Sequence, residues 1–304
     1  AQALLAQAWR KLSSQTPPAP VQAREKSYRR LQRRRRVMDG AEVDTLIFDV
    51  DDTMYPVSNG FSDHRNGEVI CKFLLAKAGF DSADEAMRVR NEYFQRYHSS
   101  MKGLKVASED GRLPKPFKEE ELASWFADEC DFSGYLKPDQ KFIDALRSLR
   151  DETGLKLVVF SNAPRPYVMN CLRALRVQEF FPDQYVFGVE DVLPACKPEP
   201  AAFHSVLESV GSTPERAVMF EDSMKNIRAC SKLGMRTVLI DEYMASRGHA
   251  ELGGEARLLG DAPSATDPSV GVTLQSIGQL RERLPELWSG RFPADLGNKQ
   301  ARQT

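Results

Sequence analysis

One stretch of this sequence decides its fold: Leu46-Ile-Phe-Asp-Val-Asp-Asp-Thr-Met-Tyr-Pro56. Its apolar start predicts a short buried strand, which is followed at once by Asp49, Asp51 and Asp52. A buried strand does not normally end in carboxylates, because removing an unpaired charge from water is costly. One interpretation is an acidic turn that caps the next helix. The other is a ligand site at the carboxyl edge of an open α/β sheet, where two carboxylates can hold Mg²⁺, attack a substrate and move a proton.

The composition predicts a globular protein of the cell interior. The chain has 304 residues, of which 41% are hydrophobic and 28% are charged, and this is enough apolar material for a core. Its 42 basic and 43 acidic residues nearly cancel, so the net charge does not point to nucleic acid. The five cysteines lack any CxxC spacing and are expected to be reduced thiols. No apolar run approaches the ~20 residues that span a bilayer, so we expect no membrane contact and, by default, a cytoplasmic location.

The first 42 residues differ from the rest. A short helix is possible over residues 1–12. Pro17, Pro18 and Pro20 would end it, and Arg29-Arg30 and Arg33 to Arg36 follow. Such a segment buries little apolar surface, so we predict that it is flexible. It is compatible with an organelle transit peptide, a nuclear address, a patch for nucleic acid or protein, or a solvated tail. Because the chain starts without methionine, we expect further residues to precede it.

A helical block is predicted to follow the first strand, over residues 57–137. Apolar side chains recur there at helical spacing, with few β-branched runs. The clearest helical stretches are residues 67–77, 83–97 and 119–126.

Strands and helices then alternate up to residue 288, which predicts a parallel sheet with helices on both faces. The predicted strands are residues 155–160, 185–187, 217–220, 237–240 and 270–274. The predicted helices are residues 139–150, 165–175, 200–210, 225–233 and 277–288. A loop rich in Gly, Ala and Ser lies between residues 244 and 269.

These patterns predict an α/β fold with an insertion. Residues 43–56 and 138–288 are expected to form a Rossmann-like parallel-sheet core. Residues 57–137 are expected to form an inserted helical cap, and residues 289–304 a loose polar tail.

Three more predicted loops carry polar residues of related chemistry. Ser161-Asn162 follows a predicted strand, and a hydroxyl with adjacent backbone N–H groups can hold phosphate oxygens. Lys197-Pro198 precedes a predicted helix, and its lysine could neutralise a phosphoryl group. Glu221-Asp222 ends another strand and offers a second acidic pair. Each signal alone is weak, because Ser-Asn is an ordinary helix cap and most lysines are simply solvated.

In this order the motifs resemble those of the haloacid dehalogenase (HAD) superfamily. The four motifs are Asp49-x-Asp-x-Thr53, Ser161-Asn162, Lys197-Pro198 and Glu221-Asp-Ser-x-x-Asn226. The resemblance implies a Rossmann-like core with a helical cap inserted after the first motif. It also implies a phosphoric monoester hydrolase that uses Mg²⁺ and forms an aspartyl-phosphate.

The resemblance assigns a role to each motif residue. Asp49 is the implied nucleophile. Asp51 is the implied general acid and then base, and its backbone carbonyl also faces the metal. Ser161, Asn162 and Lys197 are the implied phosphate contacts. Glu221 and Asp222 complete the metal site with Asp49 and Asp51, and Asp222 is the preferred direct ligand. Members that cleave carbon–halogen bonds lack the second aspartate, so Asp51 favours phosphate chemistry.

A closer resemblance is to the pyrimidine 5′-nucleotidase-like group of fungi and plants. It covers about residues 44–240 and includes Asp-Asp-Thr-Met-Tyr55, the Tyr-rich segment 93–97, Lys102-Gly-Leu104 and the return segment 135–139. Two departures lie in the cap: His98 stands where the group has Gly, and residues 122–128 lack the group's His. The candidate cap contacts with substrate are Tyr97, His98, Lys102 and Trp125, although aromatic residues at helical spacing are also typical of core packing.

The sequence therefore predicts a Mg²⁺-dependent phosphatase of small phosphomonoesters. The substrate we expect before any other is a nucleoside 5′-monophosphate. A sugar-phosphate or phosphoglycolate phosphatase, or a phosphomutase, is the alternative on the same core. A non-catalytic or moonlighting subunit, docked to protein or nucleic acid through Arg29 to Arg36, is the alternative of another class.

Overall fold

The structure is a computed structural model that describes residues 41–242 and 262–293. The predicted helix at residues 1–12, the arginines of segment 29–36 and most of the loop at 244–269 lie outside the described residues.

The core is a six-stranded sheet in which every neighbouring pair is parallel. This confirms the predicted α/β fold. The central strand β2 leads directly into Asp49, and β3 and β5 pair with its two sides. In spatial order the strands are β4 (Val186–Phe187), β3 (Lys156–Phe160), β2 (Thr45–Phe48), β5 (Ala217–Glu221), β6 (Arg236–Ile240) and β7 (Val272–Leu274).

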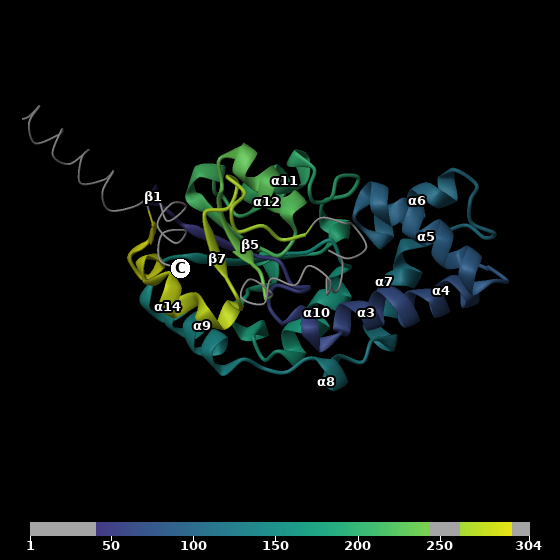
Figure 1. Ribbon diagram of the computed structural model, residues 1–304, viewed down its shortest axis with the longest axis horizontal. Helices are drawn as coiled ribbons and strands as arrows, with labels where there is room; N and C mark the ends of the chain where they lie inside the picture. Colours follow the sequence, from purple (N-terminus) through teal and green to yellow (C-terminus); the bar gives the residue numbers. More distant parts are fainter. Residues whose placement is uncertain (1–40, 243–261, 294–304) are drawn as a thin grey trace, which may run out of the picture. The chain divides into compact units, whose positions relative to one another are not determined.

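Both faces of the sheet are apolar and covered. Side chains alternate along a strand, so Phe48 belongs to one buried cluster while its neighbour Ile47 belongs to another. In Figure 1, α11 and α12 lie over one face and α9, α10 and α14 over the other. The longer helices of the core are α9 (Gln140–Glu152), α10 (Arg165–Ala174), α11 (Pro200–Ser209) and α12 (Met224–Leu233). Short 3₁₀ turns join them at η3 (Gln178–Phe180), η4 (Asp183–Tyr185), η5 (Val189–Asp191) and η6 (Pro214–Arg216).

Residues 57–135 form a helical insertion between β2 and α9. Its elements are η1 (Val57–Asn59), α3 (Phe61–His64), the π-helical turn η2 (Arg65–Val69), α4 (Ile70–Ala76), α5 (Ala83–Tyr97), α6 (Ser100–Glu109), α7 (Glu119–Glu129) and α8 (Phe132–Tyr135). Helix α6 was not predicted, since Gly103 weakens its helical signal. A Cβ at Gly103 would lie 3.3 Å from the backbone of Tyr93, so glycine lets α5 and α6 approach closely. Within the described ranges no helix is long and apolar enough to cross a membrane.

The predicted single helix over residues 277–288 is wrong. The chain forms three short pieces there. Pro285 accounts for the break before the last one, because it lacks an N–H group and its ring clashes with the preceding turn. The pieces are η7 (Ile277–Gln279), α14 (Leu280–Arg283) and η8 (Pro285–Ser289).

An antiparallel pair that the sequence analysis did not foresee joins the two ends of the described chain. Strand β1 (Ala41–Glu42) pairs with β8 (Arg291–Phe292), and Phe292 is buried. The sequence predicts residues 41–42 in the flexible segment and residues 291–292 in the loose tail, and the structure corrects both predictions. Two-residue strands are too short to produce a periodic signal.

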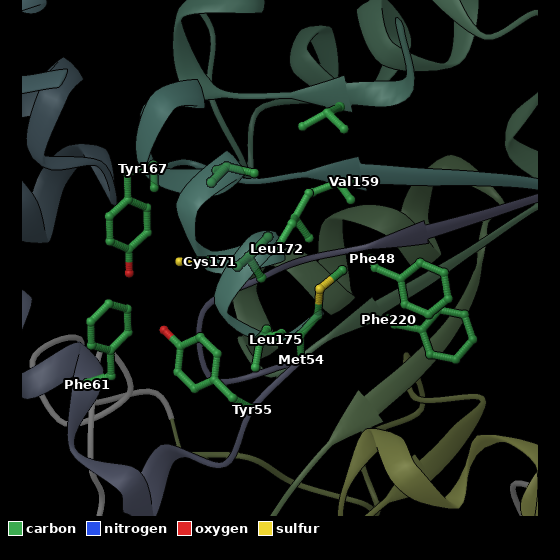
Figure 2. Close-up of a cluster of buried hydrophobic side chains, with 14 of the residues drawn as sticks. Phe48, Met54, Tyr55, Phe61, Val159, Tyr167, Cys171, Leu172, Leu175 and Phe220 are labelled. Carbon is green, nitrogen blue, oxygen red and sulfur yellow. The ribbon is translucent and has the colours of Figure 1, made fainter. Parts of the chain in front are cut away.

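Aromatic packing beneath the strand ends supports the sheet. The rings of Phe48 and Phe220 stack with centroids 4.5 Å apart, and Figure 2 shows them side by side. The two residues are register partners on β2 and β5. The ring of Phe48 also lies 5.9 Å from those of Phe142 and Phe181, so it ties both central strands to the elements below.

We expect Phe48→Ala to lower the free energy of unfolding by about 3–5 kcal/mol, because it removes a fully buried ring and leaves a cavity. Urea unfolding measures this change. The control is Leu75→Ala on the exposed side of α4, where 37% of the residue is accessible and the effect should stay within about 0.5 kcal/mol. Equal effects of the two substitutions would contradict the proposed role of Phe48.

Candidate active site

Four polar side chains meet at the carboxyl ends of the central strands. Asp49 follows β2, Ser161 follows β3 and Glu221 is the last residue of β5. Lys197 comes from the loop between η5 and α11. All four residues are buried, with at most 7% of their surface exposed. The fold therefore brings together motifs that are separated by more than a hundred residues of sequence.

Lys197 lies between two carboxylates. Its Nζ is 2.9 Å from Oδ1 of Asp49 and 2.9 Å from Oε2 of Glu221. The second oxygen of Glu221 accepts a hydrogen bond from the backbone N–H of Ser223 at 3.3 Å. Burial favours the neutral amine, but the charges of Asp49 and Glu221 outweigh it and raise the pKa of Lys197 above its ordinary value. Lys197 is therefore a buried cation at physiological pH.

The two carboxylates that pair with Lys197 belong to a cluster of three. Oxygen atoms of Asp49, Glu221 and Asp222 lie within 4.8 Å of one another, and the hydroxyl of Thr53 donates to Asp222 at 3.4 Å. Burial and the nearby charge of Glu221 raise the pKa of Asp49 well above its ordinary value, while Lys197 opposes the rise. Carboxylate oxygens are ligands that Mg²⁺ prefers, and this set of donors fits that ion.

Asp51 is held by three donors that the sequence analysis did not identify. The hydroxyls of Tyr55 and Tyr167 both donate to its Oδ1, at 2.6 Å and 2.7 Å. Its Oδ2 forms an ion pair with Nη1 of Arg65, which lies on the π-helical turn of the insertion. Tyr55 could have been suspected, because it belongs to the same motif. Arg65 and Tyr167 carry no local signal, since only the fold brings them to Asp51.

Asn162 links the two phosphate-site loops to the helical insertion. Its Nδ2 donates to the backbone carbonyl of Lys197 at 2.8 Å and to that of His98 at 3.1 Å. Its Oδ1 accepts from the backbone N–H of Lys197 at 2.9 Å. The hydroxyl of Ser99, in the insertion, donates a hydrogen bond to the backbone carbonyl of Asn162 at 3.2 Å. The side chain of Asn162 thus acts on backbone, and its contact with phosphate stays a prediction.

A small cavity of about 30 Å³ opens beside Asp49, which is room for about two water molecules. The catalytic candidates on its wall are Asp49, Asp51, Ser161, Asn162 and Lys197, and the insertion contributes Arg65, Phe94, His98, Ser99, Ser100, Met101 and Phe126.

Of the four candidate cap contacts, only His98 lines this cavity. The indole N–H of Trp125 donates to the carbonyl of Val69 at 3.0 Å. Lys102 forms an ion pair with Glu199 of the core. The ring of Tyr97 lies over that of Tyr93, with centroids 6.3 Å apart. The roles of these residues toward substrate stay predictions.

Known proteins resemble this chain in sequence and in fold. Phosphate metabolism protein 8 of Saccharomyces cerevisiae is 30% identical over 209 residues, which are 65% of this chain and 62% of that protein. Phosphoglycolate phosphatase of Pseudomonas putida is 28% identical over 145 residues, which are 46% of this chain and 52% of that protein. The chain thus spans less than two thirds of either relative's length. The crystal structure of CbbY from Rhodobacter sphaeroides in complex with phosphate matches 78% of this chain and 96% of its own, with a TM-score of 0.53 at 18% identity.

The family pattern described as haloacid dehalogenase-like hydrolase matches residues 43–234, which include all four motifs and the helical insertion. The structural likeness confirms the fold, and this match confirms the resemblance that the motifs carry. The chain belongs to the haloacid dehalogenase-like hydrolase family.

Proposed function

We propose that this protein is a Mg²⁺-dependent phosphatase that hydrolyses small phosphomonoesters through an aspartyl-phosphate on Asp49. The observation that carries the proposal is the arrangement of Asp49, Lys197, Glu221 and Asp222 at one edge of the sheet. Family membership and the phosphatase name of the Pseudomonas relative support it.

Asp49 is the proposed nucleophile. A carboxylate attacks a phosphate group slowly in water because both are negatively charged. Lys197, 2.9 Å from Asp49, supplies positive charge where the phosphoryl group must sit, and Glu221 holds it there. The hydroxyl of Ser161 lines the same cavity and can donate to a phosphate oxygen. Preorganised donors of this kind stabilise the charge that develops during transfer.

The acidic cluster is the proposed holder of the metal. Asp49, Asp222 and the backbone carbonyl of Asp51 are the proposed ligands, and Glu221 stands beside them. Mg²⁺ bound there would screen the charge of the phosphoryl oxygens and help to align the attack.

Asp51 is the proposed general acid and base. In the first step Asp49 forms a bond to phosphorus, the ester P–O bond breaks, and Asp51 protonates the departing alcohol oxygen. In the second step water attacks the aspartyl-phosphate, Asp51 takes the proton of that water, and Asp49 leaves phosphorus. The products are the alcohol and inorganic phosphate, and both aspartates return to their starting forms.

A nucleoside 5′-monophosphate is the proposed substrate. The resemblance of residues 44–240 to the pyrimidine 5′-nucleotidase-like group supports this choice. Phosphoglycolate is the second candidate, because the Pseudomonas relative is named phosphoglycolate phosphatase. The alternative of a docked subunit concerns Arg29 to Arg36, which lie outside the described residues.

We expect phosphate release from a panel that contains UMP, CMP, phosphoglycolate and hexose phosphates. Asp49→Asn should lower the rate by about a thousandfold or more, because it removes the nucleophile. A colorimetric phosphate assay measures this, with Asp144→Asn on the exposed side of α9 as the matched control. Full activity of Asp49→Asn would exclude the covalent mechanism. The ester that is hydrolysed with the highest kcat/KM identifies the preferred substrate class. Isomerisation of a hexose phosphate, without release of phosphate, would indicate a phosphomutase.

Removal of the metal should abolish activity, and Mg²⁺ should restore it. In Asp222→Asn the Mg²⁺ concentration that gives half-maximal activity should rise by more than about tenfold. Even the loss of a residue that only orients a metal ligand weakens metal binding by about tenfold or more. Mg²⁺ should also raise the melting temperature of the wild-type protein, since it binds the folded state. Asp222→Asn should lose this rise and Asp144→Asn should keep it. An unchanged rise in Asp222→Asn would place the ion elsewhere.

A further inference from the structure

The carboxylate of Asp51 is bound from three separate parts of the chain. Tyr55 follows β2, Arg65 belongs to the helical insertion and Tyr167 belongs to α10. Both hydroxyls donate to Oδ1, and Arg65 pairs with Oδ2. No more than 7% of any of these residues is exposed, so water hardly competes for the carboxylate.

The two tyrosines are suited to act as permanent donors. A phenol keeps its proton near neutral pH, so each hydroxyl can donate to Asp51 over the short distances observed. Figure 2 shows the hydroxyls of Tyr55 and Tyr167 pointing into the same space. Oδ1 of Asp51 therefore accepts two hydrogen bonds while Oδ2 pairs with Arg65, so both carboxylate oxygens are fixed in place.

Ring packing holds these donors in place. Phe61 stacks on Tyr167 with ring centroids 5.9 Å apart and planes 6° from parallel. The same ring meets Tyr55 edge-on at 5.7 Å, and the guanidinium carbon of Arg65 lies 5.0 Å from the centre of the Tyr167 ring. Locked rotamers of this kind keep a reacting group in productive geometry.

We propose that Tyr55, Arg65 and Tyr167 are positioning residues that orient Asp51 for proton transfer to the leaving group, and that Arg65 makes this orientation depend on the helical insertion. The inference rests on the proposed phosphatase function and adds residues that its four motifs do not contain. An oriented acid matters most when the leaving oxygen needs a proton, as in an alkyl phosphate. It matters least for p-nitrophenyl phosphate, whose phenolate leaves without one.

The test compares kcat/KM for p-nitrophenyl phosphate with kcat/KM for the best alkyl phosphate of the panel, both with Mg²⁺. Tyr167→Phe keeps the ring and removes only the hydroxyl, so the packing on Phe61 is retained. We expect this variant to lose about tenfold or more on the alkyl ester and less than about threefold on p-nitrophenyl phosphate, as for a general acid that has lost its orientation. Arg65→Lys should shift the ratio of the two values in the same direction.

The matched control is Tyr93→Phe. Its hydroxyl is also a donor to a carboxylate, that of Asp110 at 2.7 Å, and its ring is also buried. This substitution should leave the ratio unchanged. In the Asp51→Asn background Tyr167→Phe should shift the ratio no further, because residues that act through one group are not additive.

Two results would overturn the inference alone: equal losses of Tyr167→Phe on both esters, or a further shift of the ratio in the Asp51→Asn background. A wild-type protein that hydrolyses neither ester would overturn the proposed function and this inference with it.

Discussion

The contact on which the rest of the site depends is the buried ammonium group of Lys197 between Asp49 and Glu221. Three charges out of water are tolerated only where they are paired and hydrogen-bonded. The sheet meets this condition because β2 and β5 are neighbours in register, so that Asp49 and Glu221 emerge side by side. Lys197 arrives from a loop whose backbone is fixed by the amide of Asn162. The pairing of β2 with β5 and the bonds of Asn162 to the backbone of Lys197 therefore both hold the three charged groups together.

The helical insertion takes part in the same arrangement. His98 accepts a bond from the Asn162 amide that also holds Lys197, and Ser99 bonds to the carbonyl of Asn162. Lys102 pairs with Glu199, two residues beyond Lys197. The segment between α5 and α6 and the start of α6 therefore contact the loops that carry the proposed chemistry. A displacement of the insertion would change partners of Lys197's loop, so the two parts of the fold are physically coupled.

The sheet could be predicted from the sequence because its signals are local. Apolar runs that end in polar residues mark β2, β3 and β5, and the order of the motifs indicates the family. The partners of Asp51 could not be predicted, since Tyr167 lies 116 residues away and meets it only after folding. Pro285 could have warned against a helix over 277–288. The β1–β8 pair left no trace, because two residues show no period and the burial of Phe292 depends on distant chain.

The β1–β8 pair also determines where another domain can be joined to the described core. It lies before β2 begins, whereas Asp49 lies after β2 ends, so the four residues of β2, about 13 Å of strand, separate it from Asp49. The two ends of the described core are neighbours, held by Val43 and Gly290 through a backbone bond of 2.9 Å. A domain joined directly to residue 41 or residue 293 would therefore be attached away from the strand ends that carry Asp49. A short linker between the two ends would permit a circular permutant opened at an exposed loop.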